Sequence, residues 1–208
     1  MSKKAVVIAM DLEGVMVPEI WIAVAEKTGI EKLRLTTRDI SDYDILMKGR
    51  LEILRQNNLT LSDIQGVIET LNPLPGAKEY VEWAKQNFQL IILSDTFYEF
   101  SAPLMKKLNN PTIFCHFLQT DEKNFITDYK LRQTDAKRKA VIALRNLDFF
   151  VISIGDSYND TTMLGEADAG ILFRPPQNVI DEFPQYPVVT RYDQLKKTIT
   201  DILAEKNI

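Results

Sequence analysis

The chain has one cysteine and one histidine, and their scarcity excludes several kinds of site. Cys115 has no second cysteine to pair with, so no disulfide bond forms within the 208 residues. With His116 as the only histidine, zinc sites of the H-E-x-x-H type and any site that needs two imidazoles are excluded. The two residues are adjacent, but Thr112 to Leu118 is expected to be a strand, where successive side chains point to opposite faces. A thiol–imidazole catalytic pair is therefore not expected.

Phosphate-loop glycines, excess positive charge and long apolar runs are also missing. None of the eight glycines is spaced as in G-x-G-x-x-G or G-x-x-x-x-G-K, which excludes dinucleotide-binding and Walker-type loops. The 25 basic residues are outnumbered by 29 acidic ones, so the charge footprint of a nucleic-acid binder is absent. No window approaches the ~20 apolar residues that span a bilayer, and no signal-peptide core is visible. We expect a cytoplasmic protein that binds small molecules and has no nucleic-acid or membrane partner.

What remains is the composition of a globular protein, in which strand and helix patterns alternate. Ala5–Met10 is an unbroken apolar run, typical of a strand covered on both faces. Residues 18–71 carry only helix patterns, at Glu19–Lys27 closed by Gly29, at Ser41–Gln56, and at Leu61–Thr70 with Thr60 as N-cap. After a boundary rich in proline and glycine, the expected order is helix Ala77–Asn87, strand Gln89–Leu93, helix Tyr98–Leu108, strand Thr112–Phe117, hairpin Leu118–Arg132, helix Ala136–Leu147, strand Phe149–Ile154, a short helix after Asn159, strand Ala169–Phe173 and helix Tyr192–Glu205. This order predicts an α/β fold with a doubly wound, mostly parallel sheet and a helical insertion after the first strand.

Acidic and hydroxyl side chains follow three of the predicted strands. Asp11 and Glu13 follow the first strand, Ser94 and Asp95 the second, and the acidic segment 156–160 a later one. Ligands of open α/β sheets bind beyond the carboxyl ends of the strands, so we expect these side chains to meet at one edge. Crowded carboxylates repel one another unless a cation lies among them. Oxygen ligands at this density suit Mg²⁺, which commonly shares its shell with a substrate phosphate.

A phosphate monoester beside these carboxylates also needs a positive charge, because it adds about −1.5 to −2 charges. Lys137, at the start of a predicted helix, is the best candidate. The residues alone leave other interpretations open. Lys137 to Lys139 could be a solvated helix face, and Asp156 to Asp160 could be a turn with a helix N-cap. Asp11 differs, because a carboxylate that closes a buried strand is costly unless it is paired or binds a metal.

Taken in order, these pieces resemble the four motifs of the haloacid dehalogenase superfamily of phosphatases and phosphotransferases. The pieces are Asp11-x-Glu13-Gly14-Val15, Ser94 at a strand end, Lys137, and Gly155-Asp156-Ser157-Tyr158-Asn159-Asp160. The resemblance covers the whole chain, since the family's C1-type helical cap is inserted where Pro18–Leu71 lies. It implies a Rossmann-like catalytic core of residues 1–17 and 72–208, a cap of residues 18–71, and a β-hairpin insertion.

The resemblance also implies a role for each motif residue. Asp11 matches the nucleophile that forms an aspartyl-phosphate, and Glu13 matches the general acid and base. Lys137 matches the cation that stabilises the transition state, and Asp11, the backbone carbonyl of Glu13 and Asp156 match the Mg²⁺ ligands. Asp160 matches a residue that does not bind the metal directly but orients a metal-bound water or Lys137.

Glu13 departs from the family's commonest pattern, which has an aspartate there. Glutamate is one methylene longer, so its carboxylate sits differently relative to the water that must hydrolyse the aspartyl-phosphate. Slower attack by water gives another alcohol time to accept the phosphoryl group. We therefore hypothesise that Glu13 favours transfer over hydrolysis.

Three longer stretches are similar to bacterial bifunctional phosphoserine phosphatases and phosphoserine:homoserine phosphotransferases, which also carry this glutamate. The stretches are Asp11–Trp21, Leu93–Phe100 and Gly155–Leu164. The similarity implies O-phosphoserine as donor, homoserine as a second acceptor, and a place in serine and threonine biosynthesis. Glu19 and Arg50 match the residues that grip the substrate's ammonium and carboxylate. Ser94 and Lys137 match the residues that grip its phosphate, and Asn159 matches a position close to that phosphate. Asp95 is expected to be a further substrate-binding residue. Without the resemblance, Arg50 could equally face solvent and Glu19 could be an ordinary first-turn acid.

Two alternatives from the residues remain. The first is another capped phosphatase of the superfamily, acting on a phosphorylated sugar or nucleotide. The second is a non-enzymatic receiver module, which also gathers acids and a lysine around Mg²⁺ but is about 120 residues long and has no helical insert after its first strand. The hairpin Leu118–Arg132 offers an edge through which a homodimer could form.

Overall fold

A computed structural model describes residues 4–36, 39–40 and 42–208 of the chain. Residues 1–3 of the expected core and Ser41, the expected first residue of a helix, lie outside these ranges. Within the described part, seven strands form one sheet in the order β4-β3-β2-β1-β5-β6-β7. The strands are β1 (Val6–Met10), β2 (Gln89–Phe97), β3 (Thr112–Thr120), β4 (Ile126–Lys130), β5 (Phe150–Gly155), β6 (Ala169–Phe173) and β7 (Val188–Val189). All neighbours are parallel except β3 and β4, which confirms the predicted doubly wound, mostly parallel α/β fold.

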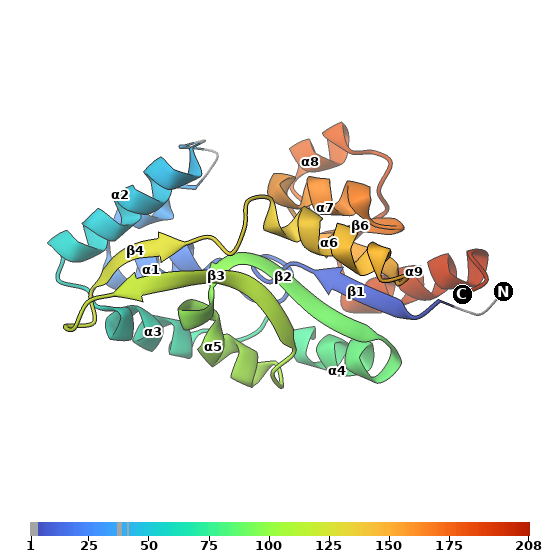
Figure 1. Ribbon diagram of the computed structural model, residues 1–208, viewed down its shortest axis with the longest axis horizontal. Coiled ribbons are helices and arrows are strands. Elements are labelled where there is room, and N and C mark those ends of the chain that lie inside the picture. The colour runs from blue at the N-terminus through green and yellow to red at the C-terminus, as the bar shows by residue number, and fades with distance from the viewer. Residues whose placement is uncertain (1–3, 37–38, 41) are drawn as a thin grey trace.

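Helices cover both faces of this sheet. They are α1 (Ile20–Thr28), α2 (Tyr43–Gln56), α3 (Leu61–Thr70), α4 (Ala77–Asn87), α5 (Tyr98–Lys107), α6 (Ala136–Asn146), α7 (Thr161–Glu166), α8 (Gln177–Glu182) and α9 (Tyr192–Glu205), with 3₁₀ turns η1 (Glu31–Arg34) and η2 (Tyr158–Asp160). Figure 1 shows α6 and α7 on one side of the sheet and α4 and α5 on the other. None of the helices in the described ranges has the length and apolar character needed to cross a membrane.

The central strand β1 is buried on both faces, as its apolar run predicts. Ile8 and Met10 pack into the larger core cluster with α4, α5 and α9, whereas Ala9 packs with α6 and α7. This alternation follows from the period of two along a strand. Because β1 pairs with β2 on one side and β5 on the other, the chain reverses direction across the sheet at β1. Ligands of doubly wound sheets bind outside such a switch point.

The segment between β1 and α4 is helical in its described residues. Gly29 ends α1 in the left-handed conformation at φ 72°, as the sequence predicts, and Thr60 caps α3 in a reciprocal capping box with Asp63. These helices lie at one end of the molecule beside β4 (Figure 1). The division into a catalytic core and a cap domain stays a prediction.

The β3–β4 hairpin braces this helical segment. Tyr129 on β4 donates a hydrogen bond from its hydroxyl to Asp44 Oδ1 on α2 at 2.7 Å. At the hairpin tip, Asn124 Oδ1 accepts hydrogen bonds from the backbone N–H and the hydroxyl of Ser62 on α3, at 2.9 and 2.8 Å. The hairpin therefore links α2 and α3 to the edge of the sheet.

The strands differ from the sequence prediction at their ends. The second strand was expected to stop at Leu93, but β2 runs on to Phe97, which pairs with His116 on β3 after a register shift. The predicted hairpin is present, but its first arm is the continuation of β3 to Thr120. The elements α8 and β7 were not expected, because six and two residues are too few for a helical or alternating pattern to be recognised.

Candidate active site

A cavity of about 580 Å³ lies at the carboxyl edge of the sheet, between the strand ends and the helical segment. Nine of the ten residues singled out from the sequence line it: Asp11, Glu13, Glu19, Arg50, Ser94, Asp95, Lys137, Asp156 and Asn159. The tenth, Asp160, has no exposed surface and contacts Lys137. The structure therefore brings all of the candidate residues to one place, from β1, β2, α1, α2, α6 and the segment after β5.

Asp11 directly follows β1 and is held by both neighbouring segments. Its backbone N–H donates to the carbonyl of Ile154 on β5 at 2.9 Å. Its Oδ1 accepts the backbone N–H of Leu12 at 2.8 Å and lies 3.0 Å from Lys137 Nζ. Burial and the negative charge of Asp160 raise the pKa of Asp11 well above its ordinary value, against the lowering effect of Lys137. A cation close to this carboxylate would oppose that rise.

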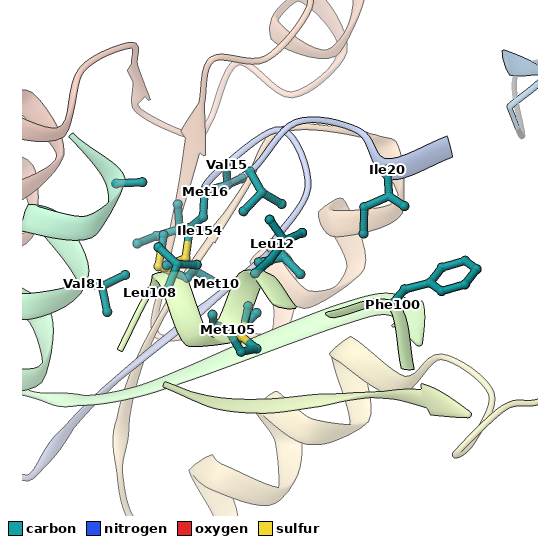
Figure 2. Close-up of a cluster of buried hydrophobic side chains, with 14 of the residues drawn as sticks. Met10, Leu12, Val15, Met16, Ile20, Val81, Phe100, Met105, Leu108 and Ile154 are labelled. Atoms are coloured by element: carbon teal, nitrogen blue, oxygen red, sulfur yellow. The ribbon is translucent and has the colours of Figure 1, made fainter. Parts of the chain in front are cut away.

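A tight turn after Asp11 places Glu13. The backbone N–H groups of Met16 and Val17 both donate to the carbonyl of Leu12. Figure 2 shows Leu12 and Met16 buried in the core beneath this turn, so the turn is anchored by apolar contacts. Glu13 Oε2 accepts the backbone N–H of Ile20, the first residue of α1, at 2.8 Å. Burial and the nearby Glu19 raise the pKa of Glu13 to about 7.

Gly14 allows this turn to lie against Asp156. Its φ is +74°, and a Cβ atom there would lie 2.4 Å from Asp156 Oδ2. Any other residue would therefore be strained and would push the carboxylate away. Burial, together with the charges of Asp160 and Glu19, raises the pKa of Asp156 to about 7.

Lys137 is the positive centre of the site. Its ammonium lies 2.8 Å from Asp160 Oδ1, 3.0 Å from Asp11 Oδ1 and 3.4 Å from Asp95 Oδ2. Burial lowers its pKa, but the carboxylates of Asp11, Asp160 and Asp95 outweigh burial and hold the pKa of Lys137 well above its usual value. The lysine therefore stays charged, and the solvated-face alternative for this residue does not hold, since its side chain is only 4% exposed.

Asp160 supports both Lys137 and the loop after β5. Its Oδ2 accepts the backbone N–H groups of Asp156 and Ser157 at 2.9 and 3.2 Å, while Oδ1 takes the ammonium. The segment after β5 therefore also forms a turn with a helix N-cap, the alternative that the sequence left open for these residues. Gly155 makes the close packing possible, since a Cβ atom there would lie 2.3 Å from Asp160 Cβ.

Three carboxylates of this site could hold a metal ion. Oxygens of Asp11, Asp156 and Asp160 all lie within 4.8 Å of one another. Both oxygens of Asp160 already accept protein donors, so Asp11 and Asp156 are the better first ligands. An all-oxygen donor set with two carboxylates fits Mg²⁺. Burial and the neighbouring negative charges raise the pKa values of Asp11 and Asp156, and a bound cation would oppose that rise.

Arg50 reaches the cavity from α2. Its guanidinium stacks over the ring of Trp21 with Cζ 4.6 Å from the centroid, and one terminal nitrogen donates to the carbonyl of Leu35 at 2.6 Å. Its Nε is buried without a hydrogen-bond partner, and burial lowers its pKa to about 10. A buried cation with an unused donor favours an anionic ligand at this end of the cavity. Glu19, at the N-cap position of α1, is exposed beside it.

The β2 segment carries Ser94 and Asp95 into the site. Ser94 is 3% exposed, and its Oγ accepts the backbone N–H of Thr96 at 3.2 Å. Asn159 Nδ2 donates to Asp95 Oδ2 at 3.2 Å. Lys137, His116 and Asn159 outweigh the effect of burial and hold the pKa of Asp95 well below its usual range. Asp95 is therefore an ionised carboxylate at the cavity wall.

Sequence reasoning missed three residues of this cavity, His116, Thr96 and Tyr43. His116 was weighed only as a partner for Cys115. Its Nδ1 instead accepts the backbone N–H of Arg132 at 3.1 Å, and its Nε2 lies 3.6 Å from Asp95 Oδ1. Tyr43 donates its hydroxyl to the carbonyl of Asp95 at 3.3 Å, and Thr96 hydrogen-bonds the Glu13 side chain. The register of β2 on β3, which the sequence does not specify, produces the His116 contact.

Replacing Lys137 by methionine tests the charge balance of the site. The change leaves buried carboxylates without their cation, and we expect it to lower the free energy of unfolding by about 3–5 kcal/mol at pH 8. A carboxyl whose pKa is raised in the folded protein destabilises the fold progressively as the pH rises from its ordinary pKa to its folded pKa. For Asp156 this range is from 3.8 to about 7, so the loss should be smaller at pH 5 than at pH 8. Urea denaturation at both pH values, in buffer with a metal chelator, measures it.

Lys139→Met is the matched control, because Lys139 is exposed on the same helix and its ammonium donates to Thr134 Oγ1 rather than to a carboxylate of the site. It should change stability by less than about 0.5 kcal/mol. An equal loss for Lys137→Met at pH 5 and pH 8 would contradict the charge balance described here.

Comparisons with known proteins show the family of the chain. The family model of haloacid dehalogenase-like hydrolases matches residues 6–168. A protein of Pseudomonas syringae pv. tomato named "Phosphoserine phosphatase" is 64% identical over 188 residues, covering 90% of this chain and 79% of that protein. "Phosphoserine phosphatase ThrH" of Pseudomonas aeruginosa is 61% identical over 188 residues, covering 90% and 92%.

Solved structures show the same fold at lower identity. A phosphoserine phosphatase from T. onnurineus superposes with a TM-score of 0.73 at 24% identity, covering 94% of each chain. A substrate-bound phosphoserine phosphatase complex gives 0.74 at 17% identity, covering 96% of this chain and 99% of that one. The match to the family model over most of the chain, together with relatives above 60% identity, identifies the protein: it belongs to the haloacid dehalogenase-like hydrolases.

Proposed function

We propose that this chain is a Mg²⁺-dependent phosphoserine phosphatase that forms an aspartyl-phosphate on Asp11 and also transfers the phosphoryl group to homoserine. One observation carries the substrate assignment. A single cavity is lined by Asp11 and Lys137 and also by Arg50 from α2, whose buried Nε has no hydrogen-bond partner. A phosphate beside Asp11 and Lys137 and a carboxylate beside Arg50 describe a phosphorylated amino acid. The names of the two curated relatives support this assignment.

In the first step Asp11 attacks phosphorus. A bond forms between a carboxylate oxygen of Asp11 and phosphorus, and the bond from phosphorus to the serine oxygen breaks. Glu13 donates its proton to the departing serine oxygen. The carboxyl of Glu13 is held for this task by the backbone N–H of Ile20 and by Thr96. Asp11 and Asp156 would hold Mg²⁺, which would supply positive charge to offset that of the phosphoryl oxygens.

In the second step the phosphoryl group leaves Asp11. The ionised Glu13 takes a proton from the attacking water or alcohol, whose oxygen bonds to phosphorus while the acyl-phosphate bond breaks. Asp11 is regenerated as a carboxylate. With water the product is inorganic phosphate, and with homoserine it is phosphohomoserine. Lys137 stays charged through both steps and offsets the negative charge on phosphorus.

The amino-acid assignment is tested by Arg50→Lys. Lysine keeps the charge but lacks the planar fork that matches a carboxylate. We expect the KM for O-phosphoserine to rise about tenfold to hundredfold, while turnover of phosphoethanolamine, which lacks the carboxylate, changes little. Initial rates of phosphate release against concentration of each ester measure the difference.

Arg55→Lys is the matched control on the same helix, because Arg55 is exposed and pairs with Glu52 at 2.9 Å. It should leave both esters unaffected. Equal losses on both esters for Arg50→Lys, or a preference of the unaltered protein for a sugar or nucleotide phosphate, would overturn the assignment. Labelling of the protein without steady turnover would favour the receiver alternative.

The proposed transferase activity depends on the length of the Glu13 side chain. In the structure its carboxyl is tied to the start of α1 by the Ile20 N–H, and an aspartate would fall short of that donor by one methylene. We expect Glu13→Asp to lower the ratio of phosphohomoserine to inorganic phosphate severalfold when O-phosphoserine, homoserine and Mg²⁺ are incubated together. Both products are quantified in one reaction. A ratio that does not change would show that Glu13 does not control the partition.

A further inference from the structure

The ammonium of Lys137 is surrounded by carboxylates of the protein. It donates a hydrogen bond to Asp160 Oδ1 at 2.8 Å and forms ion pairs with Asp11 at 3.0 Å and with Asp95 at 3.4 Å. Asp95 also accepts the side-chain N–H of Asn159 at 3.2 Å. The family resemblance places Lys137 and Asn159 beside the phosphate of the substrate. In the structure both contact the carboxylate of Asp95, Lys137 as an ion pair and Asn159 as a hydrogen-bond donor.

Of the three carboxylates, Asp95 is the one that an incoming anion can replace. Its side chain is 39% exposed, whereas those of Asp11 and Asp160 are 7% and 0% exposed. It lines the cavity, and its distance to the ammonium is the longest of the three. Asp11 and Asp160 are instead fixed by backbone N–H groups.

Other contacts hold Asp95 in place when an incoming anion displaces it from Lys137 and Asn159. His116 Nδ1 accepts the N–H of Arg132, so a neutral imidazole carries its proton on Nε2, the nitrogen that lies 3.6 Å from Asp95 Oδ1. His116 is 3% exposed. Tyr43 holds the carbonyl of Asp95 at 3.3 Å. The carboxylate therefore has a further partner in His116 on β3, and Tyr43 on α2 separately holds the backbone of the same residue.

We propose that Asp95 is an internal anion that competes with the phosphoryl group of substrate and product for Lys137 and Asn159, and so weakens the retention of inorganic phosphate. The inference rests on the proposed function only in that the cavity receives a phosphate. An ionised carboxylate next to a phosphate dianion repels it and also occupies its donors. Asp95 thereby limits product inhibition, because phosphate must leave before the next substrate binds.

The test is Asp95→Asn, which removes the charge and keeps the size of the side chain. Calorimetric titration with inorganic phosphate in Mg²⁺ buffer should give a dissociation constant about tenfold lower than that of the unaltered protein. The inhibition constant of phosphate against O-phosphoserine should fall by a similar factor, with no rise in kcat. Thermal denaturation checks folding, and Asp95→Ser, which also removes the charge, replaces the variant if it does not fold.

Asp135→Asn is the matched control. Asp135 lines the same cavity, but its partners are Arg138 and Thr162. Removing its charge should change phosphate affinity less than twofold. Unchanged or weaker phosphate binding in Asp95→Asn, or an equal gain in Asp135→Asn, would overturn the proposal. The titration needs no turnover, so failure of O-phosphoserine as a substrate would refute the proposed function and leave this test intact.

Discussion

The site depends on the ammonium of Lys137 lying among carboxylates that come from three separate segments. Asp11 follows β1, Asp95 lies on β2, and Asp160 follows β5, and each lies within 3.4 Å of Lys137 Nζ. Without this charge the buried carboxylates would repel one another. That repulsion would destabilise the turn that holds Glu13 and the loop that holds Asp156. The charged ammonium also makes the site suitable for a phosphate, because the negative phosphate oxygens need a cation that keeps its charge when it is buried.

The fold makes this convergence possible through the position of β1 between β2 and β5. The three strands end at one edge, and the helical segment closes that edge with Arg50 on α2 and Glu19 before α1. The hairpin links the same segment to the sheet through Tyr129 and Asn124. In the proposed function, the residues at the strand ends and Lys137 on α6 would act on the phosphate, and the helical segment would recognise the rest of the substrate.

Most of the fold could be predicted from the sequence, because its signals are local. The apolar run of β1, the capping box at Thr60 and the helices α3, α4 and α9 follow from residues close in the chain. The candidate residues could be found because the strand ends carry acids. The partners of Asp95 could not, since the contact with His116 depends on a register shift between β2 and β3, and register follows from tertiary packing. The sequence likewise could not predict that Arg50 Nε has no hydrogen-bond partner, because this depends on how α2 packs against Trp21.

The central claim is that the Asp11 carboxylate becomes covalently phosphorylated. The most direct measurement is mass spectrometry of the peptide containing Asp11, after the protein is mixed with O-phosphoserine and Mg²⁺ and quenched in acid within one turnover. We expect a phosphoryl adduct on Asp11 that is lost on treatment with hydroxylamine, because hydroxylamine cleaves acyl-phosphates. Release of phosphate without any adduct, or an adduct on another residue, would contradict it.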